Sequence, residues 1–102
     1  LTSSTRLPAP ILGHVGDGNF HCTILANPES PEELDEAERL NQAIVTAALA
    51  MDGTCTGEHG VGLHKIDFLV AEHGEGAVDL MRALKHALDP NNLMNPGKVV
   101  RW

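Results

Sequence analysis

Apolar residues recur every three or four positions after residue 30, which is the spacing of one face of an α-helix. Ser30 is a good N-cap, Pro31 suits the first helical position, and Glu33 completes the sequence of a capping box. Gly53 is the expected stop. The pattern predicts a long helix that begins at Pro31 and whose inward face consists of Ala37, Leu40, Ile44, Ala48 and Met51.

Two shorter helices follow in the second half of the chain. The first is predicted from about Leu63 to His73, with Gly74 as its stop and with Ile66, Leu69 and Val70 facing inward. The second is predicted over residues 75–88 and ends at Asp89-Pro90, because proline does not continue a helix. Its inward residues are expected to be Val78, Met81, Leu84, Ala87 and Leu88.

The first part of the chain alternates in the manner of strands. Residues 10–14 and 19–26 are predicted to form an antiparallel hairpin with Asp17-Gly18 at its tip, because Asp-Gly accepts the positive φ angles of a tight turn. This tip would place His14 directly opposite His21. Opposed residues on one sheet face have Cβ atoms about 4.5–5.5 Å apart, so both imidazoles could reach one metal ion.

A hairpin and three helices predict an α+β domain in which the helices cover one face of a small antiparallel sheet. Residues 1–9 are expected to be a linker or arm, and residues 10–102 the domain itself. Two strands alone are too few for a stable sheet, so further strands are expected elsewhere. The start at Leu1 indicates a piece of a longer polypeptide or a processed product.

Composition narrows the classes of partner. The chain has 102 residues, of which 42% are hydrophobic and 21% charged, as expected for one small globular domain. The net charge of −7, without a Lys/Arg cluster, argues against binding to nucleic acid or to an anionic membrane surface. The longest apolar run, residues 43–51, is too short to span a bilayer. Cys22 and Cys55 are expected to be reduced thiols rather than a disulfide.

The candidate chemistry lies in two glycine-rich segments. His14 and His21 flank the predicted hairpin tip, and Glu58 lies between Gly57 and Gly60. Two imidazoles and one carboxylate leave coordination positions open, which is typical of catalytic zinc, although Mn²⁺ or Fe²⁺ would accept the same ligands. The sequence therefore predicts a divalent metal site of His14, His21 and Glu58.

His59 is expected to have a different task from its neighbour Glu58. Histidine titrates near neutral pH, which suits a general base beside a Lewis acid. Asp17 and Asn19 could orient a ligand histidine. The remaining histidines, at positions 64, 73 and 86, are expected to be ordinary helix residues. The residues alone indicate a metal-assisted active site and do not fix its reaction, so a mononuclear metal hydrolase and a non-catalytic domain that binds metal or a partner stay open as alternatives.

Three ordered motifs resemble one family: Gly-His-Val-Gly-Asp-Gly-Asn-Phe-His at residues 13–21, Gly-Thr-Cys-Thr-Gly-Glu-His-Gly-Val-Gly at residues 53–62, and Leu-Met-Asn-Pro-Gly-Lys at residues 93–98. They are similar to the C-terminal end of the FAD-linked 2-hydroxyacid dehydrogenases, which include D-lactate dehydrogenase, the glycolate oxidase FAD subunit and D-2-hydroxyglutarate dehydrogenase. The similarity extends from about Pro10 to Val100.

The resemblance implies a ferredoxin-like C-terminal substrate domain, with most of the FAD held by a separate N-terminal domain. It assigns His14, His21 and Glu58 to zinc or manganese, His59 to substrate and proton abstraction, and Asn95 to the vicinity of the flavin. The implied reaction is oxidation of a D-2-hydroxy acid to the 2-oxo acid. The chain by itself is expected to be inactive, because it lacks almost all of the flavin pocket.

One position bears on the substrate. Members that act on 2-hydroxyglutarate carry Asn two residues after the second histidine, where this chain has Thr23. This difference favours lactate, glycolate or another short 2-hydroxy acid. The implied location is cytoplasmic or peripheral to the inner membrane, and mitochondrial in a eukaryote. Exposed sheet edges favour association between copies, and the sequence names no electron acceptor.

Overall fold

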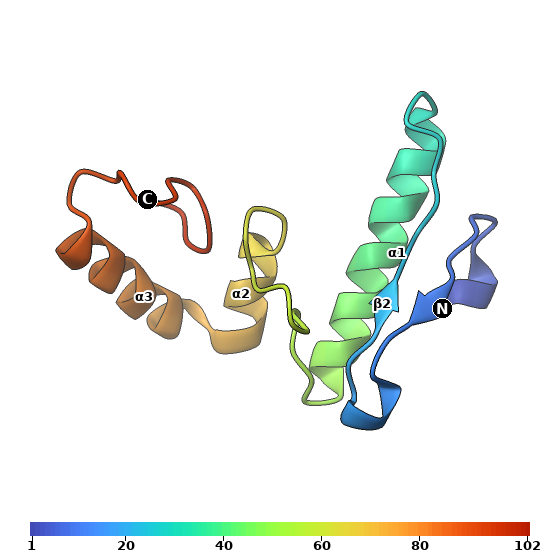
Figure 1. Cartoon of the computed structure of the whole chain (residues 1–102), viewed down its shortest axis with the longest axis horizontal. Coiled ribbons are helices and arrows are strands. Elements are labelled where there is room, and N and C mark those ends of the chain that lie inside the picture. Colours follow the sequence, from blue (N-terminus) through green and yellow to red (C-terminus); the bar gives the residue numbers. More distant parts are fainter. The chain divides into compact units, whose positions relative to one another are not determined.

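The computed structural model describes residues 1–102 and divides into two units, residues 1–53 and residues 54–102 (Figure 1). The first unit contains the short helices η1 (Thr2–Ser4) and η2 (Val15–Asp17), strands β1 (Ile11–Leu12) and β2 (His21–Cys22), and helix α1 (Pro31–Ala50). The second contains helices α2 (Ile66–His73) and α3 (Glu75–Leu88). A two-stranded antiparallel sheet and three longer helices confirm the α+β class.

The hairpin has a different register from the predicted one. Leu12 pairs with His21 and Ile11 with Cys22, so a loop from Gly13 to Phe20 replaces the two-residue turn at Asp17-Gly18. Beyond the strands, the same register continues where Thr23 N donates to Pro10 O (3.0 Å) and Leu25 N donates to Pro8 O (2.9 Å). Proline has no N–H to return the second bond of each pair. The regular strands are therefore shorter than predicted, although the pairing extends further.

Helix α1 begins and ends as its sequence predicts. The Ser30 hydroxyl accepts a hydrogen bond from Glu33 N (3.4 Å), and Pro31 occupies the first turn. The Glu33 carboxylate accepts from Asn27 N (2.7 Å), further back along the chain than a capping box would place it. At the other end, Gly53 N donates to Ala48 O and Asp52 N to Leu49 O, which together form a Schellman motif.

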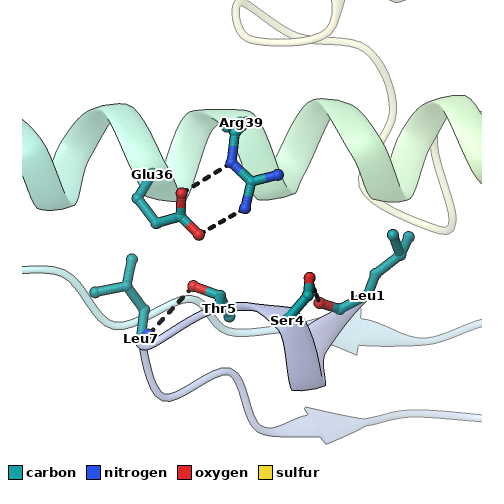
Figure 2. A network of polar contacts seen from close by, with 6 residues as sticks. All are labelled: Leu1, Ser4, Thr5, Leu7, Glu36 and Arg39. Atoms are coloured by element: carbon teal, nitrogen blue, oxygen red, sulfur yellow. Dashed lines mark hydrogen bonds and ion pairs between the residues drawn. The ribbon is translucent and has the colours of Figure 1, made fainter.

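The first unit packs extended chain along α1. The segment that follows β2 runs beside this helix (Figure 1), whose residues Leu40 and Val45 are buried. Glu36 of α1 forms a bidentate ion pair with Arg39, with N–O distances of 2.8 and 2.7 Å (Figure 2). These bonds, and a further one from the Thr5 side chain, lower the pKa of Glu36 to about 2. Residues near the N-terminus thus contact α1, while the predicted domain boundary at residue 9 stays a prediction.

The second unit is built around a small core shared by α2, α3 and the C-terminal tail. Gly74, with φ of 82°, ends α2 as predicted and leads directly into α3. Leu69 of α2, Val78 of α3 and Val100 of the tail are buried together. Val61, Val70 and Met81 pack against this cluster and are partly buried. The core therefore joins the tail to the glycine-rich segment that precedes α2.

Several predicted inward residues are exposed. Met51 lies beyond the end of α1 and is 77% exposed, and Leu84 and Leu88 of α3 are 55% and 78% exposed. Ala87 is exposed as well. In contrast, Val45 and Val100 are buried although the sequence pattern did not single them out. Helical spacing identified a face of each helix, but not how much of that face is covered.

Candidate metal and substrate site

The first candidate ligand, His14, lies on the loop between β1 and β2, and the second, His21, is the first residue of β2. The carbonyl oxygen of His14 accepts hydrogen bonds from Asp17 N (2.9 Å) and Asn19 N (3.2 Å), and Gly18 adopts a left-handed conformation with φ of 74°. His14 is exposed to solvent, whereas His21, at the start of β2, is half-buried. The predicted direct opposition of His14 and His21 is wrong, because Leu12 occupies the position opposite His21.

A close backbone approach nevertheless brings the two arms of this loop together next to both histidines. A Cβ atom added to Gly13 would lie 2.7 Å from Phe20 Cα and 2.8 Å from Asn19 O, so only glycine fits there. Gly13 precedes His14 and Phe20 precedes His21 in sequence. The geometry therefore constrains the two histidines through a narrow loop neck rather than through a tight turn.

Glu58 and His59 lie together in the second unit, on the irregular segment between Gly57 and Gly60. His59 Nε2 is 3.5 Å from Glu58 Oε1, and both side chains are largely exposed to solvent. Gly60 has a φ of 76°, a conformation that favours glycine. The local backbone thus directs two chemically useful side chains of adjacent residues toward the same space.

The segment around Glu58 and His59 is fixed at both ends. Before it, Cys55 N donates a hydrogen bond to Glu72 Oε2 of α2 (2.9 Å). After it, Val99 N of the tail donates to Gly62 O (2.8 Å). Val99 has a φ of 68°, which is unusual for a β-branched residue and requires support from its surroundings. Helix α2 and the tail therefore hold the ends of the candidate site segment.

Cys55 is a buried free thiol, as expected from the sequence, and Cys22 is also free. Burial raises the pKa of Cys55 to about 11, and its hydrogen bond to the Glu72 carboxylate adds to this increase. The thiol is thus protonated near neutral pH and is a poor nucleophile. Cys55 contributes packing and a hydrogen bond at this position.

Asn95, the residue expected near the flavin, lies in the tail after α3. The preceding turn is organised by Asp89, which is 5% exposed. Its carboxylate accepts hydrogen bonds from Leu93 N (2.9 Å) and Met94 N (2.9 Å) and forms an ion pair with Lys85, which also donates to Met94 O. These contacts fix the backbone immediately before Asn95, whose φ of 47° is left-handed.

The contacts of Glu72 and Asp89 were not predicted from the sequence. For Asp89 a signal existed, because Lys85 precedes it by four residues and an Asp before a Pro-Asn-Asn turn can accept bonds from later N–H groups. For Glu72 there was none, because its contact spans 17 positions of the sequence. The histidines assigned to ordinary roles include His86, which stacks on Trp102 with ring centroids 4.0 Å apart, and His73, 3.7 Å from Glu72.

The ion pair of Asp89 leads to a prediction about acid stability. The Lys85 ammonium and the Leu93 and Met94 N–H groups lower the pKa of Asp89 from 3.8 to about 2. A carboxylate with a lowered pKa stabilises the folded state fully above its unfolded pKa, and this contribution is lost as the pH falls from 3.8 toward 2. We expect Asp89→Asn to melt at a lower temperature than the wild type above this interval.

Thermal melting followed by circular dichroism over that pH interval measures this effect. The difference in melting temperature between wild type and Asp89→Asn should shrink as Asp89 becomes protonated. Asp35→Asn, at an exposed position of α1, is the matched control and should show no such convergence. A constant difference between wild type and Asp89→Asn across the interval would contradict the assignment.

Comparison with known proteins identifies the family. The model of the C-terminal domain of FAD linked oxidases matches residues 2–99. This chain belongs to that family. A probable mitochondrial D-lactate dehydrogenase of Danio rerio is 52% identical over 97 residues, which are 95% of this chain and 20% of the relative.

Two other similar proteins have names that state different activities. The glycolate oxidase subunit GlcD of Bacillus subtilis is 41% identical over 87 residues, which are 85% of this chain and 18% of the relative. A D-2-hydroxyglutarate dehydrogenase of Xanthomonas citri is 37% identical over 90 residues, which are 85% of this chain and 19% of the relative. The chain thus spans about a fifth of the length of these relatives.

The resemblance stated from the three sequence motifs is confirmed by this family membership. The family is FAD-linked, and its members in the comparison are oxidoreductases that act on hydroxy acids according to their names. None of the helices here combines the length and the apolar character needed to cross a bilayer.

Proposed function

We propose that this chain is the C-terminal part of a flavin-dependent dehydrogenase that oxidises a D-2-hydroxy acid of the lactate or glycolate type. The observation that carries the proposal is the match of residues 2–99 to the family model, and within these residues the loop neck at Gly13 and Phe20 constrains His14 and His21. We assign His14, His21 and Glu58 to a divalent metal ion, zinc or manganese, and His59 to proton abstraction. Asn95 is assigned to the flavin.

The donor set fits a divalent ion. Two imidazoles and one carboxylate suit zinc or manganese and leave coordination positions open for a substrate. When bound, such an ion would act as a Lewis acid that the hydroxyl and carboxylate of a 2-hydroxy acid can chelate, and it would lower the pKa of that hydroxyl. A bound flavin supplies the acceptor for the hydride. The N-terminal flavin-binding domain that the family context implies would hold most of this cofactor.

Removal of the hydroxyl proton of the substrate is assigned to residues of this chain. His59 takes the proton of the substrate hydroxyl at Nε2. The carbon that carries this hydroxyl gives up its hydride, and its C–O bond becomes a carbonyl. Glu58 Oε1 lies 3.5 Å from this nitrogen, so the proposed base stands directly beside the carboxylate assigned to the ion. In the tail, the hydrogen bonds to Asp89 hold the backbone at Leu93 and Met94, immediately before Asn95.

Two observations favour a short 2-hydroxy acid over 2-hydroxyglutarate. Thr23 stands where the hydroxyglutarate enzymes carry Asn, and the D-lactate dehydrogenase of Danio rerio has a higher identity than the hydroxyglutarate enzyme of Xanthomonas citri, 52% against 37%. The relatives named as D-lactate dehydrogenases in fish, plant and yeast are mitochondrial. For a eukaryotic source, we therefore propose a mitochondrial location.

The test is substrate oxidation by the full-length protein. We expect it to contain flavin, and to reduce an artificial electron-accepting dye with D-lactate or glycolate. L-Lactate is the stereochemical control, and D-2-hydroxyglutarate should be a poorer substrate. A metal chelator should abolish the activity and Zn²⁺ or Mn²⁺ should restore it.

Ester or amide hydrolysis by a flavin-free full-length protein would instead favour a metal hydrolase. The isolated chain should show no flavin absorbance.

A further inference from the structure

Glu72 has contacts that the proposed chemistry does not use. It lies at the penultimate position of α2, and its side chain is 13% exposed. Its Oε2 accepts the hydrogen bond from Cys55 N at 2.9 Å, and its carboxylate also accepts bonds from the Thr54 hydroxyl and the Cys55 thiol. One side chain therefore satisfies several groups of a segment that has no secondary structure of its own.

The pKa of Glu72 reflects its hydrogen bonds with Thr54 and Cys55. Burial alone would raise the pKa of Glu72, yet the hydrogen bonds from Cys55 and Thr54 hold this pKa below its usual range. Hydrogen bonds to an ionised acceptor are roughly twice as strong as those between neutral groups. The carboxylate is thus a charged anchor on a helix whose Leu69 is packed into the core.

The anchored residues are close in sequence to the proposed metal ligand and general base. Cys55 precedes Glu58 by three residues, and three residues of extended chain span at most ~10 Å. Only Thr56 and Gly57 lie between Cys55 and Glu58, so release of Cys55 would free Glu58 to move over part of that range. A displacement of about 1 Å at a reacting group can cost ~10²-fold in rate.

We infer that Glu72 is a positioning residue, which sets the place of Glu58 and His59 by holding Thr54 and Cys55 to α2. This inference rests on the proposed function for its catalytic consequence, while the anchoring itself can be measured independently. Glu72 touches neither the ion nor the substrate in this account. Its effect passes through the backbone from Cys55 to Glu58.

The experiment compares Glu72→Ala, Glu72→Asp and Glu72→Gln in the full-length protein. The affinity for Zn²⁺, measured by calorimetry on metal-free protein, should fall ~10–100-fold in Glu72→Ala. The affinity of Glu72→Asp should also fall, because this variant keeps the charge but withdraws the acceptor by one methylene. Glu72→Gln should recover part of the affinity, because its amide oxygen still accepts from Cys55 N but carries no charge. Glu75→Ala, which removes an exposed carboxylate at the start of α3, is the matched control.

A second measurement follows the anchor without reference to metal or activity. The rate at which iodoacetamide alkylates Cys55, measured by peptide mass spectrometry relative to Cys22, should rise in Glu72→Ala and Glu72→Asp and stay unchanged in Glu75→Ala. Circular dichroism identifies any variant that fails to fold, and Glu72→Asp then decides the outcome.

The two ideas fail in different ways. Wild-type protein that binds no Zn²⁺ would overturn the proposed function, and the alkylation rates would still decide the role of Glu72. Unchanged Cys55 alkylation in folded Glu72→Ala and Glu72→Asp would overturn the anchor. Glu72→Gln as defective in Zn²⁺ affinity as Glu72→Ala would overturn the hydrogen-bond mechanism.

Discussion

Replacing His59 by alanine is expected to lower kcat of the full-length protein by ~10²–10⁴-fold, because this is the usual contribution of a general base. The content of divalent metal should stay at the wild-type level, since His59 is assigned to the proton and not to the ion. The variant keeps Glu58, whose carboxylate lies 3.5 Å from His59 Nε2 in the wild type. Steady-state kinetics and metal analysis of the same preparation measure both quantities.

The control for His59 is His64→Ala, another histidine of the second unit with an exposed side chain. It should keep both kcat and metal content. Equal loss of metal and activity in His59→Ala would identify His59 as a ligand instead of the base. Wild-type kcat in His59→Ala would remove the residue from the mechanism altogether.

Replacing His14 or His21 by alanine, or Glu58 by glutamine, is expected to remove bound metal and activity together. With two ligands left, the site should no longer retain stoichiometric Zn²⁺ through dialysis, and kcat/KM should fall to the level of chelator-treated wild type. Metal content by elemental analysis and dye-reduction kinetics test this for each variant. Addition of excess Zn²⁺ should restore Glu58→Gln more readily than the histidine variants, because an amide oxygen is a weak but available ligand.

The matched controls are His64→Ala for the two imidazoles and Glu75→Gln for the carboxylate. Both positions are exposed, and neither lies in the segments assigned to the ion. Full metal content in His14→Ala would refute the role of that residue. Retention of metal in all three ligand variants would refute the site as proposed.

The helices were predicted well because capping and stop residues lie next to the helix ends that they define. The predicted third helix and the observed α3 have the same bounds, Glu75–Leu88, since Gly74 and Asp89-Pro90 delimit it. Ser30, Pro31 and Gly53 likewise delimit α1. The start of α2 was predicted about three residues too early, at Leu63 rather than Ile66. Helix existence and helix ends could thus be derived from capping and stop residues.

The hairpin register could not be derived in the same way. Asp17-Gly18 is a strong turn signal, yet the structure forms η2 at Val15–Asp17 and closes the loop at Gly13 and Phe20. Pro8 and Pro10 accept bonds from Leu25 and Thr23, which fits the observed register because these positions need no N–H donor. Long-range pairing outweighed the preference of one dipeptide.

Which residues of α3 are buried depends on the length of α2, the helix packed against it. Helix α2 has 8 residues and α3 has 14, so their lengths are about 12 Å and 21 Å at 1.5 Å per residue. Within this chain α2 covers the part of α3 around Val78, and the amphipathic stripe continues uncovered to Leu84 and Leu88. Periodicity therefore found the right face of α3 and overestimated the buried length.

Short stretches of the chain were enough to predict the α+β class, the helix ends, the family motifs and the candidate residues His14, His21, Glu58, His59 and Asn95, because each signal comes from neighbouring residues. Long-range contacts set the pairing of Leu12 with His21, the closure of the loop at Gly13, and the contacts of Glu72 with Cys55 and of Asp89 with the tail turn. These features depend on which N–H groups, carboxylates and apolar surfaces meet after the chain folds, and short-range preferences do not contain that information.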